Sequence, residues 1–252
     1  MAKVLLPLPD TDFDTTEVAV PWHVLTRAGH EVVFATERGP AGPVPACDPL
    51  LLSGVLFGKL GAAPDAKAQY ARLVEDRAFR APIAWGTLAP DDYAAVLLPG
   101  GHAPGMKQML GSAELQAKVA AAWALDRPFA AICHGVLLAA RAIDPATGKS
   151  ILHRARTTCL PAYMERGAYY MTAWKLGRYY RTYPAYVEAE VGAALADPGA
   201  QLARGPLTMS ARGTDDDDGP AFVIEDGRYV SARWPGDAWA FAKALLRRID
   251  PA

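Results

Sequence analysis

The chain lacks most of the features that assign a protein to a class at a glance. Its 252 residues carry 26 basic and 27 acidic side chains, so the formal net charge is only −1. Such an even balance gives no global attraction to nucleic acid or to anionic membranes, and neither partner is expected. The three cysteines are too few, and odd in number, for a disulfide framework, which favours a reducing compartment.

Long apolar runs and nucleotide-binding fingerprints are also missing. The N-terminal stretch "MAKVLLPLPDTD" has one lysine, and its apolar part is too short for a signal peptide or a membrane span. A cytoplasmic protein is therefore expected. Neither G-x-G-x-x-G nor G-x-x-x-x-G-K-S/T occurs. Because no repeat or long linker is visible and 51% of the residues are hydrophobic, we expect one domain over 1–252 with a small insertion lobe.

What the sequence does contain is an alternation of buried strands with helices. It predicts strands at 3–9, 30–36, 93–101 and 127–133, and helices at 14–28, 65–77, 112–126 and 236–249. Residues 221–234 are typical of a hairpin with Asp226–Gly227 at its turn. This order predicts an α/β fold with a doubly wound, mostly parallel sheet and helices on both faces. Insertions are expected near 38–90 and 165–220.

The stretch "AAICHGVLLAA" (130–140) contains the first candidate for chemistry. A buried strand ends at Cys133 and a helix resumes after Gly135, so the cysteine occupies an elbow at the carboxyl edge of the sheet. Ligands of open parallel sheets bind at this edge. The helix N-terminus is expected to lower the thiol pKa, and Gly135 leaves room for the turn. Cys133 is thus a candidate nucleophile, with a buried structural cysteine as the alternative.

Histidine and glycine residues are expected at the same edge. His134 could turn back to act as a base, or it could be only a turn residue. His102 ends the glycine loop "LLPGGHAPG". The backbone N–H groups of Gly100, Gly101 and His134 could form an oxyanion hole opposite the thiolate. A glycine pair is by itself equally typical of a plain connecting turn.

Glu17 lies in the first turn of the first predicted helix, where its neighbours favour a structural role. Asp14 stands three residues before it. This is the spacing of a capping box, in which the Glu17 carboxylate would accept a hydrogen bond from the Asp14 N–H. The local pattern alone favours the cap.

Three stretches together resemble the ThiJ/PfpI superfamily, which has the class I glutamine-amidotransferase-like fold. They are "EVAVPWHVLTRAGHEVVFAT", "YAAVLLPGGHAPG" and "AAICHG", with a weaker match in "DGRYVSARWPGDAWAFAKALL". The chain length and the excursion at 38–90 look most like the larger branch of glutathione-independent glyoxalases and stress-inducible holding chaperones. The resemblance implies a flavodoxin-like sheet.

The resemblance also implies roles for individual residues. Glu17, four residues before Pro21, would be the protonated partner of the Cys133 thiolate and a proton carrier, which reverses the capping interpretation. In the larger branch a downstream carboxylate orients the histidine, and Glu165 is the matching candidate; an exposed charge is its alternative. The metal-binding His/Glu set of some members has no clear match, so neither metal nor cofactor is expected.

Residues 169–191 depart from the family because they are rich in aromatic and basic side chains. Arg178 and Arg181 in this segment, or Arg233 after it, could bind a carboxylate or a phosphate, with His102 as a further substrate contact. The segment could instead form an interface, since Tyr, Trp and Arg are enriched at the hot spots of protein contacts. A homodimer is expected.

Three functions are compatible with these residues. The first is a cofactor-free, glyoxalase III-type lyase that converts a small 2-oxoaldehyde such as methylglyoxal into a 2-hydroxy acid, with Cys133 as nucleophile and Glu17 or His134 moving the proton. The second is a cysteine amidase or peptidase that uses Cys133, His134 and Glu165 on an acyl substrate. The third is a stress-response holding chaperone or a redox sensor. Glutamine amidotransferase activity is not expected, because His153 lacks a glutamate two positions later.

Overall fold

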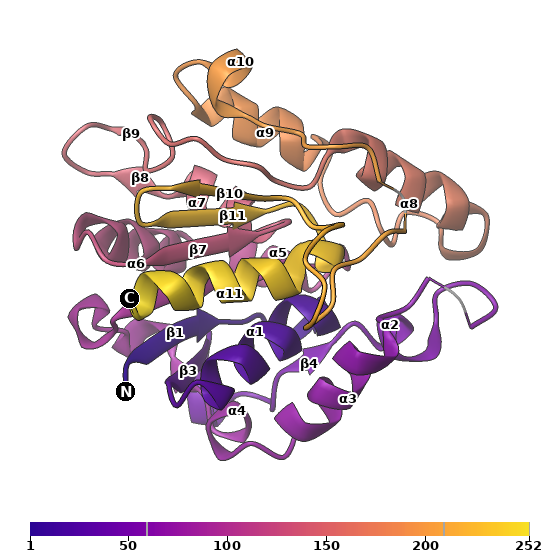
Figure 1. The fold of residues 1–252 in the computed structure, drawn as a ribbon, viewed down its shortest axis with the longest axis horizontal. Coiled ribbons are helices and arrows are strands. Elements are labelled where there is room, and N and C mark those ends of the chain that lie inside the picture. The colour runs from indigo at the N-terminus through magenta and orange to yellow at the C-terminus, as the bar shows by residue number, and fades with distance from the viewer. Residues whose placement is uncertain (59, 209, 252) are drawn as a thin grey trace.

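A seven-stranded sheet forms the centre of the computed structural model, which describes residues 1–58, 60–208 and 210–251. Its strands are β1 (Lys3–Pro7), β3 (Glu31–Thr36), β5 (Ile83–Ala84), β6 (Ala95–Leu98), β7 (Phe129–Ile132), β10 (Val223–Asp226) and β11 (Tyr229–Ala232). They follow the order β10-β11-β7-β6-β1-β3-β5, and all neighbours are parallel except β10 and β11 (Figure 1). The predicted doubly wound, mostly parallel α/β fold is confirmed.

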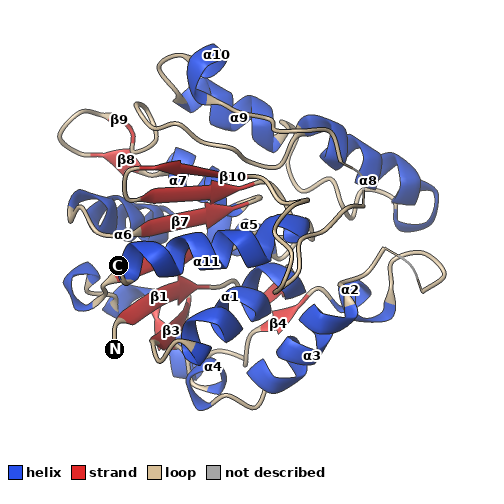
Figure 2. Ribbon diagram, in the orientation of Figure 1, coloured by secondary structure: helices blue, strands red, loops and turns tan. Residues whose placement is uncertain are grey.

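Helices cover both faces of this sheet. They are α1 (Thr15–Arg27), α2 (Pro49–Ser53), α3 (Pro64–Leu73), α4 (Arg77–Arg80), α5 (Met106–Leu110), α6 (Ala113–Ala124), α7 (Gly135–Arg141), α8 (Ala162–Leu176), α9 (Val187–Ala194), α10 (Pro198–Gln201) and α11 (Ala238–Ile249). Helices α1 and α11 pack together on one face, whereas α6 and α7 lie behind the sheet (Figure 2). With both faces covered, every residue of β6 and β7 is buried. Among the described helices, none is both long and apolar enough to cross a membrane.

The insertions contribute small elements outside the main sheet. Two short ribbons pair β2 (Thr11–Phe13) with β4 (Ala46–Cys47) and β8 (Ile143–Asp144) with β9 (Lys149–Ser150). Helices α2 to α4 belong to the first predicted insertion, and α8 to α10 belong to the second. In Figure 1, α8 and the loop after α2 extend at the right, beyond the carboxyl ends of the parallel strands.

The closing hairpin differs in one detail from the prediction. Its two-residue turn is Gly227–Arg228, because Asp226 still pairs with Tyr229 as the last residue of β10. Gly227 has a φ of 58°, a left-handed conformation that favours glycine. The backbone preference of this glycine therefore sets the turn one residue later than the Asp–Gly pair suggested.

Candidate active site

Cys133 occupies the elbow between β7 and α7 and has a strained backbone. Its φ is 57°, a left-handed conformation that costs a non-glycine residue roughly 1–2 kcal/mol. The elbow is held by the Cys133 N–H, which donates to the Ala232 carbonyl over 3.0 Å. Gly135 is required next to it, because a methyl group there would overlap the Leu98 carbonyl group. The cysteine is 1% exposed, so the elbow fixes a buried thiol at the carboxyl edge of the sheet.

Glu17 reaches this thiol from α1 and does not cap the helix. Its Oε2 accepts a hydrogen bond from the Gly100 N–H over 2.7 Å, whereas the Asp14 N–H donates to the Gly100 carbonyl. The Asp14 carboxylate alone caps α1, by accepting from the N–H groups of Thr16 and Glu17. A side chain at Gly100 would come within 2.9 Å of both Glu17 Oε2 and Cys133 Cβ. Only glycine therefore fits between the carboxyl and the cysteine, which lie side by side.

Burial decides the protonation of this pair. Burial, followed by the charge of Asp14, raises the pKa of Glu17 well above its ordinary value and favours the neutral acid. Burial also raises the pKa of the Cys133 thiol, and an ionised Glu17 would raise it further. The expectation that the helix N-terminus lowers this pKa is thus corrected, because desolvation of the thiolate outweighs it. When Glu17 is protonated it carries no charge, so it no longer raises the pKa of the Cys133 thiol through charge repulsion.

Two imidazole rings complete the polar side of the site. Nδ1 of His134 is 3.6 Å from Cys133 Sγ, and the His102 ring meets the His134 ring edge-on with centroids 4.8 Å apart. Burial lowers the pKa of His134 well below its ordinary value and lowers that of His102 to about 4. Both rings are therefore neutral near pH 7. No three His, Cys, Asp or Glu side chains cluster as metal ligands in the described part of the chain.

The predicted oxyanion groups divide into two kinds. The Gly100 N–H is engaged by Glu17, so it is not available to a substrate oxygen. The Gly101 N–H donates to no acceptor within the described residues, and the His134 N–H faces Cys133 Sγ. Gly101 and His134 are thus the two amides that remain as candidates for an oxyanion hole.

Asp14 should make the stability of the protein depend on pH. Burial raises its pKa from 3.8 to about 6 although it accepts two backbone hydrogen bonds. The folded-state pKa lies above the unfolded value, so protonated Asp14 favours the folded state. This contribution to the free energy of unfolding is complete below about pH 4 and is lost as the pH rises through about 6. Asn also caps helices but does not titrate.

Between about pH 4 and pH 7, we therefore expect the wild type to lose about 2 kcal/mol of unfolding free energy relative to Asp14→Asn. Urea denaturation at a series of pH values measures this difference. Parallel pH profiles for the two proteins would contradict the assignment.

Glu165 lies away from His134, which corrects the predicted orienting role. Its Oε1 accepts from Arg181 Nη1 over 3.0 Å, and its Oε2 accepts from the Val187 N–H over 3.0 Å. The carboxylate therefore joins α8 to the start of α9. Arg181 is engaged in the same contact and lies 3.8 Å from the centroid of the Tyr186 ring, so it is a structural residue and not a substrate ligand.

Arg233 is likewise unavailable to a substrate, contrary to its predicted role. It is 1% exposed, its Nε and Nη2 donate to the Asp237 carboxylate over 2.9 Å each, and its Nη1 donates to the Pro206 carbonyl. Arg178, the third predicted arginine, is exposed beyond α8. It does not line the cavity that adjoins the site at His102, which is described below. None of the three predicted arginines contacts this cavity.

Removing Asp237 would leave the Arg233 guanidinium buried without its ion-pair partner. We expect Asp237→Ala to lower the free energy of unfolding by about 3–5 kcal/mol, because breaking a buried ion pair exposes the full desolvation cost of the remaining charge. Asp215→Ala removes a much more exposed pair with Arg27 and should cost no more than about 1 kcal/mol. Chemical denaturation of both variants tests this, and equal losses would refute it.

A cavity of about 170 Å³ meets the site at His102 and Asp14, between the carboxyl edge of the sheet and α8; Cys133 lies behind His102 and His134 and is not itself part of the lining. Its lining includes Asp14, Thr16, His102, Leu160, Met164, Ala168, Met171, Arg212 and Trp234. A hollow of about 130 Å³ adjoins it and shares His102 and Met171. Neither Arg212 nor Trp234 is among the site residues predicted from the sequence. Their only sequence signal is their position on the loops that flank the last hairpin.

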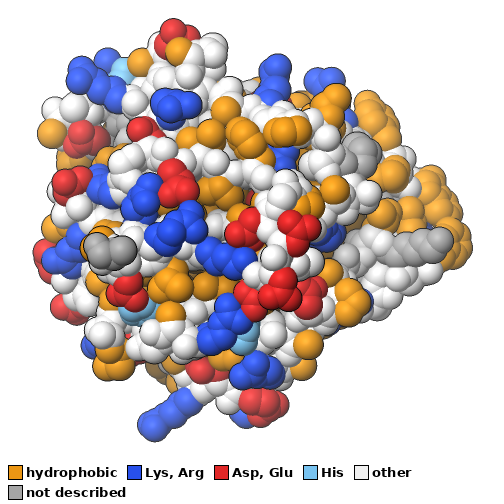
Figure 3. All heavy atoms as spheres, viewed as in Figure 1, with side chains coloured by type: hydrophobic (Ala, Val, Ile, Leu, Met, Phe, Trp, Pro, Cys, Tyr) orange, Lys and Arg blue, Asp and Glu red, His pale blue; other side chains and the backbone are white. Residues whose placement is uncertain are grey.

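The aromatic and basic segment 169–191 divides between this cavity and the surface. Tyr180 lines the adjoining hollow and donates to Asp48 over 2.8 Å. Trp174 is 68% exposed and stacks on the exposed Phe57 ring. Hydrophobic side chains gather at this end of the molecule, over α8 and the loop after α2 (Figure 3). The segment therefore contributes to both the pocket wall and an exposed apolar surface.

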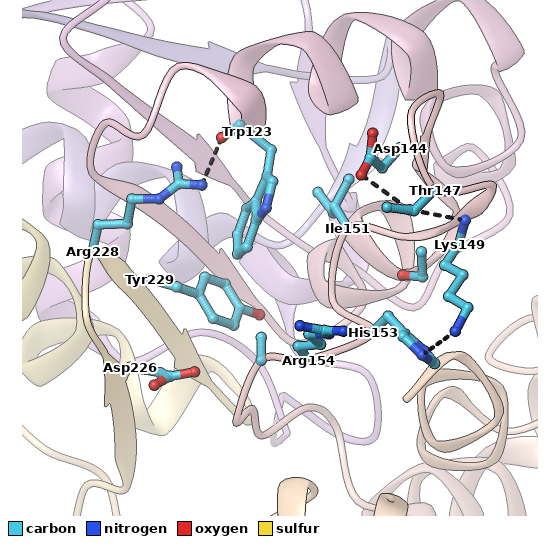
Figure 4. Close-up of a pocket in the computed structure, with 12 residues that line it drawn as sticks. Trp123, Asp144, Thr147, Lys149, Ile151, His153, Arg154, Asp226, Arg228 and Tyr229 are labelled. Carbon is cyan, nitrogen blue, oxygen red and sulfur yellow. Dashed lines mark hydrogen bonds between the residues drawn. The ribbon is translucent and has the colours of Figure 1, made fainter. Parts of the chain in front are cut away.

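A larger cavity of about 550 Å³ lies at the opposite edge of the sheet (Figure 4). Its wall includes Tyr229, which pairs with Phe129 at the start of β7, whereas Cys133 follows the end of that strand. The Arg228 guanidinium lies 4.4 Å from the centroid of the Trp123 ring. Because parallel sheets bind ligands at the carboxyl ends of their strands, the cavity beside Cys133 is the better candidate for the active site.

Comparison with known proteins identifies the family of the chain. A sequence profile described as ThiJ/PfpI family-like matches residues 8–206. The chain belongs to the ThiJ/PfpI family. An uncharacterised protein of Schizosaccharomyces pombe is 28% identical over 260 residues, covering 99% of this chain and 85% of the relative.

One further sequence relative and one solved structure carry the name of an activity. The deglycase PfpI of Pyrococcus furiosus is 26% identical over 151 residues, which cover 59% of this chain and 72% of the relative. The structure of glyoxalase III from Candida albicans superposes with a TM-score of 0.66 at 20% identity and covers 98% of this chain and 97% of the other. At that identity the superposition shows a shared fold.

Proposed function

We propose that this protein is a glyoxalase III-type enzyme that converts a small 2-oxoaldehyde into a 2-hydroxy acid without glutathione. The observation that carries the proposal is the strained, buried Cys133 between a carboxyl group that favours its acid form and a neutral imidazole. This arrangement supplies a nucleophile, a proton donor and a proton acceptor within one site. The fold shared with a glyoxalase III and the deglycase relative support it.

The first step is addition of the thiol to the aldehyde. The bond between Cys133 Sγ and the aldehyde carbon forms as the carbonyl π bond breaks, and the thiol proton passes to the new hydroxyl group. Neutral His134, with Nδ1 3.6 Å from Sγ, can relay this proton. The N–H groups of Gly101 and His134 can stabilise the oxygen while it is charged. The product is a hemithioacetal.

The second step moves hydrogen between the two oxygenated carbons. A base removes the proton from the carbon bonded to sulfur, which gives an enediol, and an acid returns a proton to the adjacent carbon. Neutral His134 and protonated Glu17 have the protonation states that these roles require. The resulting thioester is hydrolysed by water, which breaks the carbon–sulfur bond, restores the thiol and releases the 2-hydroxy acid.

Amide hydrolysis is the weaker candidate for the same cysteine. A Cys133–His134–Glu165 triad requires the carboxylate to hold the imidazole in position. Glu165 instead accepts its hydrogen bonds from Arg181 and the Val187 N–H. The geometry therefore supports aldehyde chemistry more strongly than acyl transfer from an amide.

The test is turnover of methylglyoxal by fully reduced protein in a buffer without glutathione. We expect one lactate for each methylglyoxal consumed, after correction for the reaction in buffer alone. Quantification by NMR measures both compounds in one sample. Absence of lactate formation by folded, reduced protein would contradict the proposal.

A further inference from the structure

We propose that the cavity beside Cys133 selects 2-oxoaldehydes that carry a carboxylate at the far end of a short chain, with Arg212 as the residue that binds it. This inference rests on the proposed function for the chemistry at the aldehyde end. It concerns specificity, and it assigns the anion-binding role to an arginine other than the three expected from the sequence.

Four buried polar atoms of the cavity lining lack a hydrogen-bond partner among the described residues: Thr16 Oγ1, His102 Nε2, Arg212 Nη1 and Trp234 Nε1. Buried polar groups are nearly always paired, so such a cluster calls for a bound group that satisfies it. Hydroxyl, guanidinium and indole groups all donate, and an ionised carboxylate only accepts. The lining thus offers the donors that a carboxylate requires.

Arg212 is held in place before any ligand arrives. Its guanidinium lies 4.8 Å from the centroid of the Trp234 ring, and Trp234 is itself only 6% exposed. The next residue, Gly213, donates its N–H to the Gly236 carbonyl over 2.8 Å, which fixes the loop against the turn after β11. Bidentate recognition of carboxylates is the usual task of an arginine positioned in this way.

Asp14 is the carboxylate that shares the cavity with Arg212, and its charge must be considered. One of its oxygens already accepts from the N–H groups of Thr16 and Glu17, which directs it toward the α1 backbone. Burial raises its pKa to about 6 although the nearby Arg212 charge lowers it, so an anion that binds Arg212 weakens this interaction and is accompanied by a proton on Asp14. The Arg212 charge then remains for the ligand.

The size and the walls of the cavity limit the ligand. Its volume of about 170 Å³ lies below the roughly 300–1,000 Å³ of sites for drug-sized molecules. Leu160, Met164 and Met171 contribute apolar walls to the cavity. We therefore expect a short apolar chain, of two or three methylene groups, between the reacting carbonyls and the anion.

A suitable probe is 4,5-dioxopentanoate, which has a 2-oxoaldehyde at one end and a carboxylate at the other. Its conversion to 2-hydroxyglutarate consumes one water: the aldehyde hydrogen moves to the adjacent carbon, and the water oxygen enters the new carboxylate. No oxidant or reductant is needed. The neutral comparison is 2-oxohexanal, which has a similar length and no charge.

The experiment measures kcat/KM for both compounds in four proteins: wild type, Arg212→Gln, Trp234→Phe and Arg80→Gln. We expect the wild type to prefer the acid. Arg212→Gln should lose roughly 10- to 100-fold on the acid and less than about threefold on the neutral compound. Trp234→Phe, which keeps an aromatic ring but removes the N–H, should lose about fivefold on the acid alone. Arg80→Gln removes an exposed charge and should match the wild type.

Calorimetry with glutarate separates this inference from the proposed function, because binding needs no chemistry. Glutarate should bind wild type and Arg80→Gln and should bind Arg212→Gln at least about tenfold more weakly. If neither aldehyde is converted but glutarate binds in this way, the proposed function fails and the anion site stands. Two results would overturn the inference. One is conversion of both aldehydes with equal losses of kcat/KM in Arg212→Gln and Trp234→Phe. The other is glutarate binding to Arg212→Gln that is as tight as binding to the wild type.

Discussion

Replacing Cys133 with alanine is expected to lower kcat for methylglyoxal by at least about 10⁴-fold. Every covalent step of the proposed reaction passes through Sγ, and no second thiol lies at this elbow. Alanine removes only the sulfur and keeps the backbone donors on either side of it. Lactate formation by the purified variant measures the loss, and circular dichroism confirms that it is folded.

The other two cysteines provide matched controls for this substitution. Cys47 and Cys159 are buried as Cys133 is, and burial raises the pKa of each of their thiols. Neither has the left-handed backbone conformation of Cys133, so Cys47→Ala and Cys159→Ala should retain turnover within about threefold of the wild type. If Cys133→Ala keeps more than about one per cent of the activity, or if a control variant loses as much, Cys133 is not the nucleophile.

Glu17→Gln is expected to lower kcat by about 10²- to 10⁴-fold with a small change in KM. Glutamine has nearly the same shape, and its side-chain oxygen can still accept from the Gly100 N–H, but it carries no exchangeable acid proton. The loss therefore reports proton transfer and not packing. Steady-state kinetics of the wild type and the variant at the same pH measure it.

Glu165→Gln is the control for Glu17, because it changes a second buried glutamate whose pKa is also raised by burial. Its contacts are with Arg181 and the Val187 N–H, so we expect some loss of stability and a kcat within about threefold of the wild type. The reverse order, with Glu165→Gln far less active than Glu17→Gln, would restore the orienting role that the structure removes.

Most of the sheet could be predicted because apolar runs and helical patterns alternate clearly along the chain. The fully buried strands β6 and β7 leave short runs such as "AVLL" and "FAAI", which have few other interpretations. The carboxyl ends of parallel strands meet at one edge, so the proximity of Cys133 to the loop after β6 followed from the order of elements. The short edge strand β5 has no comparable signal, since it is only two residues long.

Local pattern could not decide the role of Glu17. The spacing from Asp14 satisfies a capping box, and the same spacing places a carboxyl on the buried side of α1. Only the tertiary contact with Gly100 distinguishes the two, because the Asp14 N–H donates across the sheet edge and leaves Glu17 free to face Cys133.

The arginines show where sequence reasoning reached its limit. Arg181 has a partner sixteen residues away, and nothing in the sequence indicates that this contact forms. Arg233 and Asp237 stand four residues apart, but the stretch between them contains Pro235 and Gly236 and is not an α-helix, so the helical i, i+4 rule gave no sign of their ion pair. Arg212 gives no sign in the sequence either. What distinguishes it is a buried guanidinium nitrogen, Nη1, that has no hydrogen-bond partner among the described residues.

A crystal structure of Glu17→Gln soaked with methylglyoxal tests most directly whether Cys133 forms the covalent adduct. The variant retains the nucleophile but should isomerise the adduct slowly, so the hemithioacetal should accumulate. We expect continuous density from Cys133 Sγ to the aldehyde carbon, with the oxygen within hydrogen-bonding distance of the Gly101 and His134 N–H groups. An unmodified Cys133 in crystals that bind methylglyoxal elsewhere would contradict it.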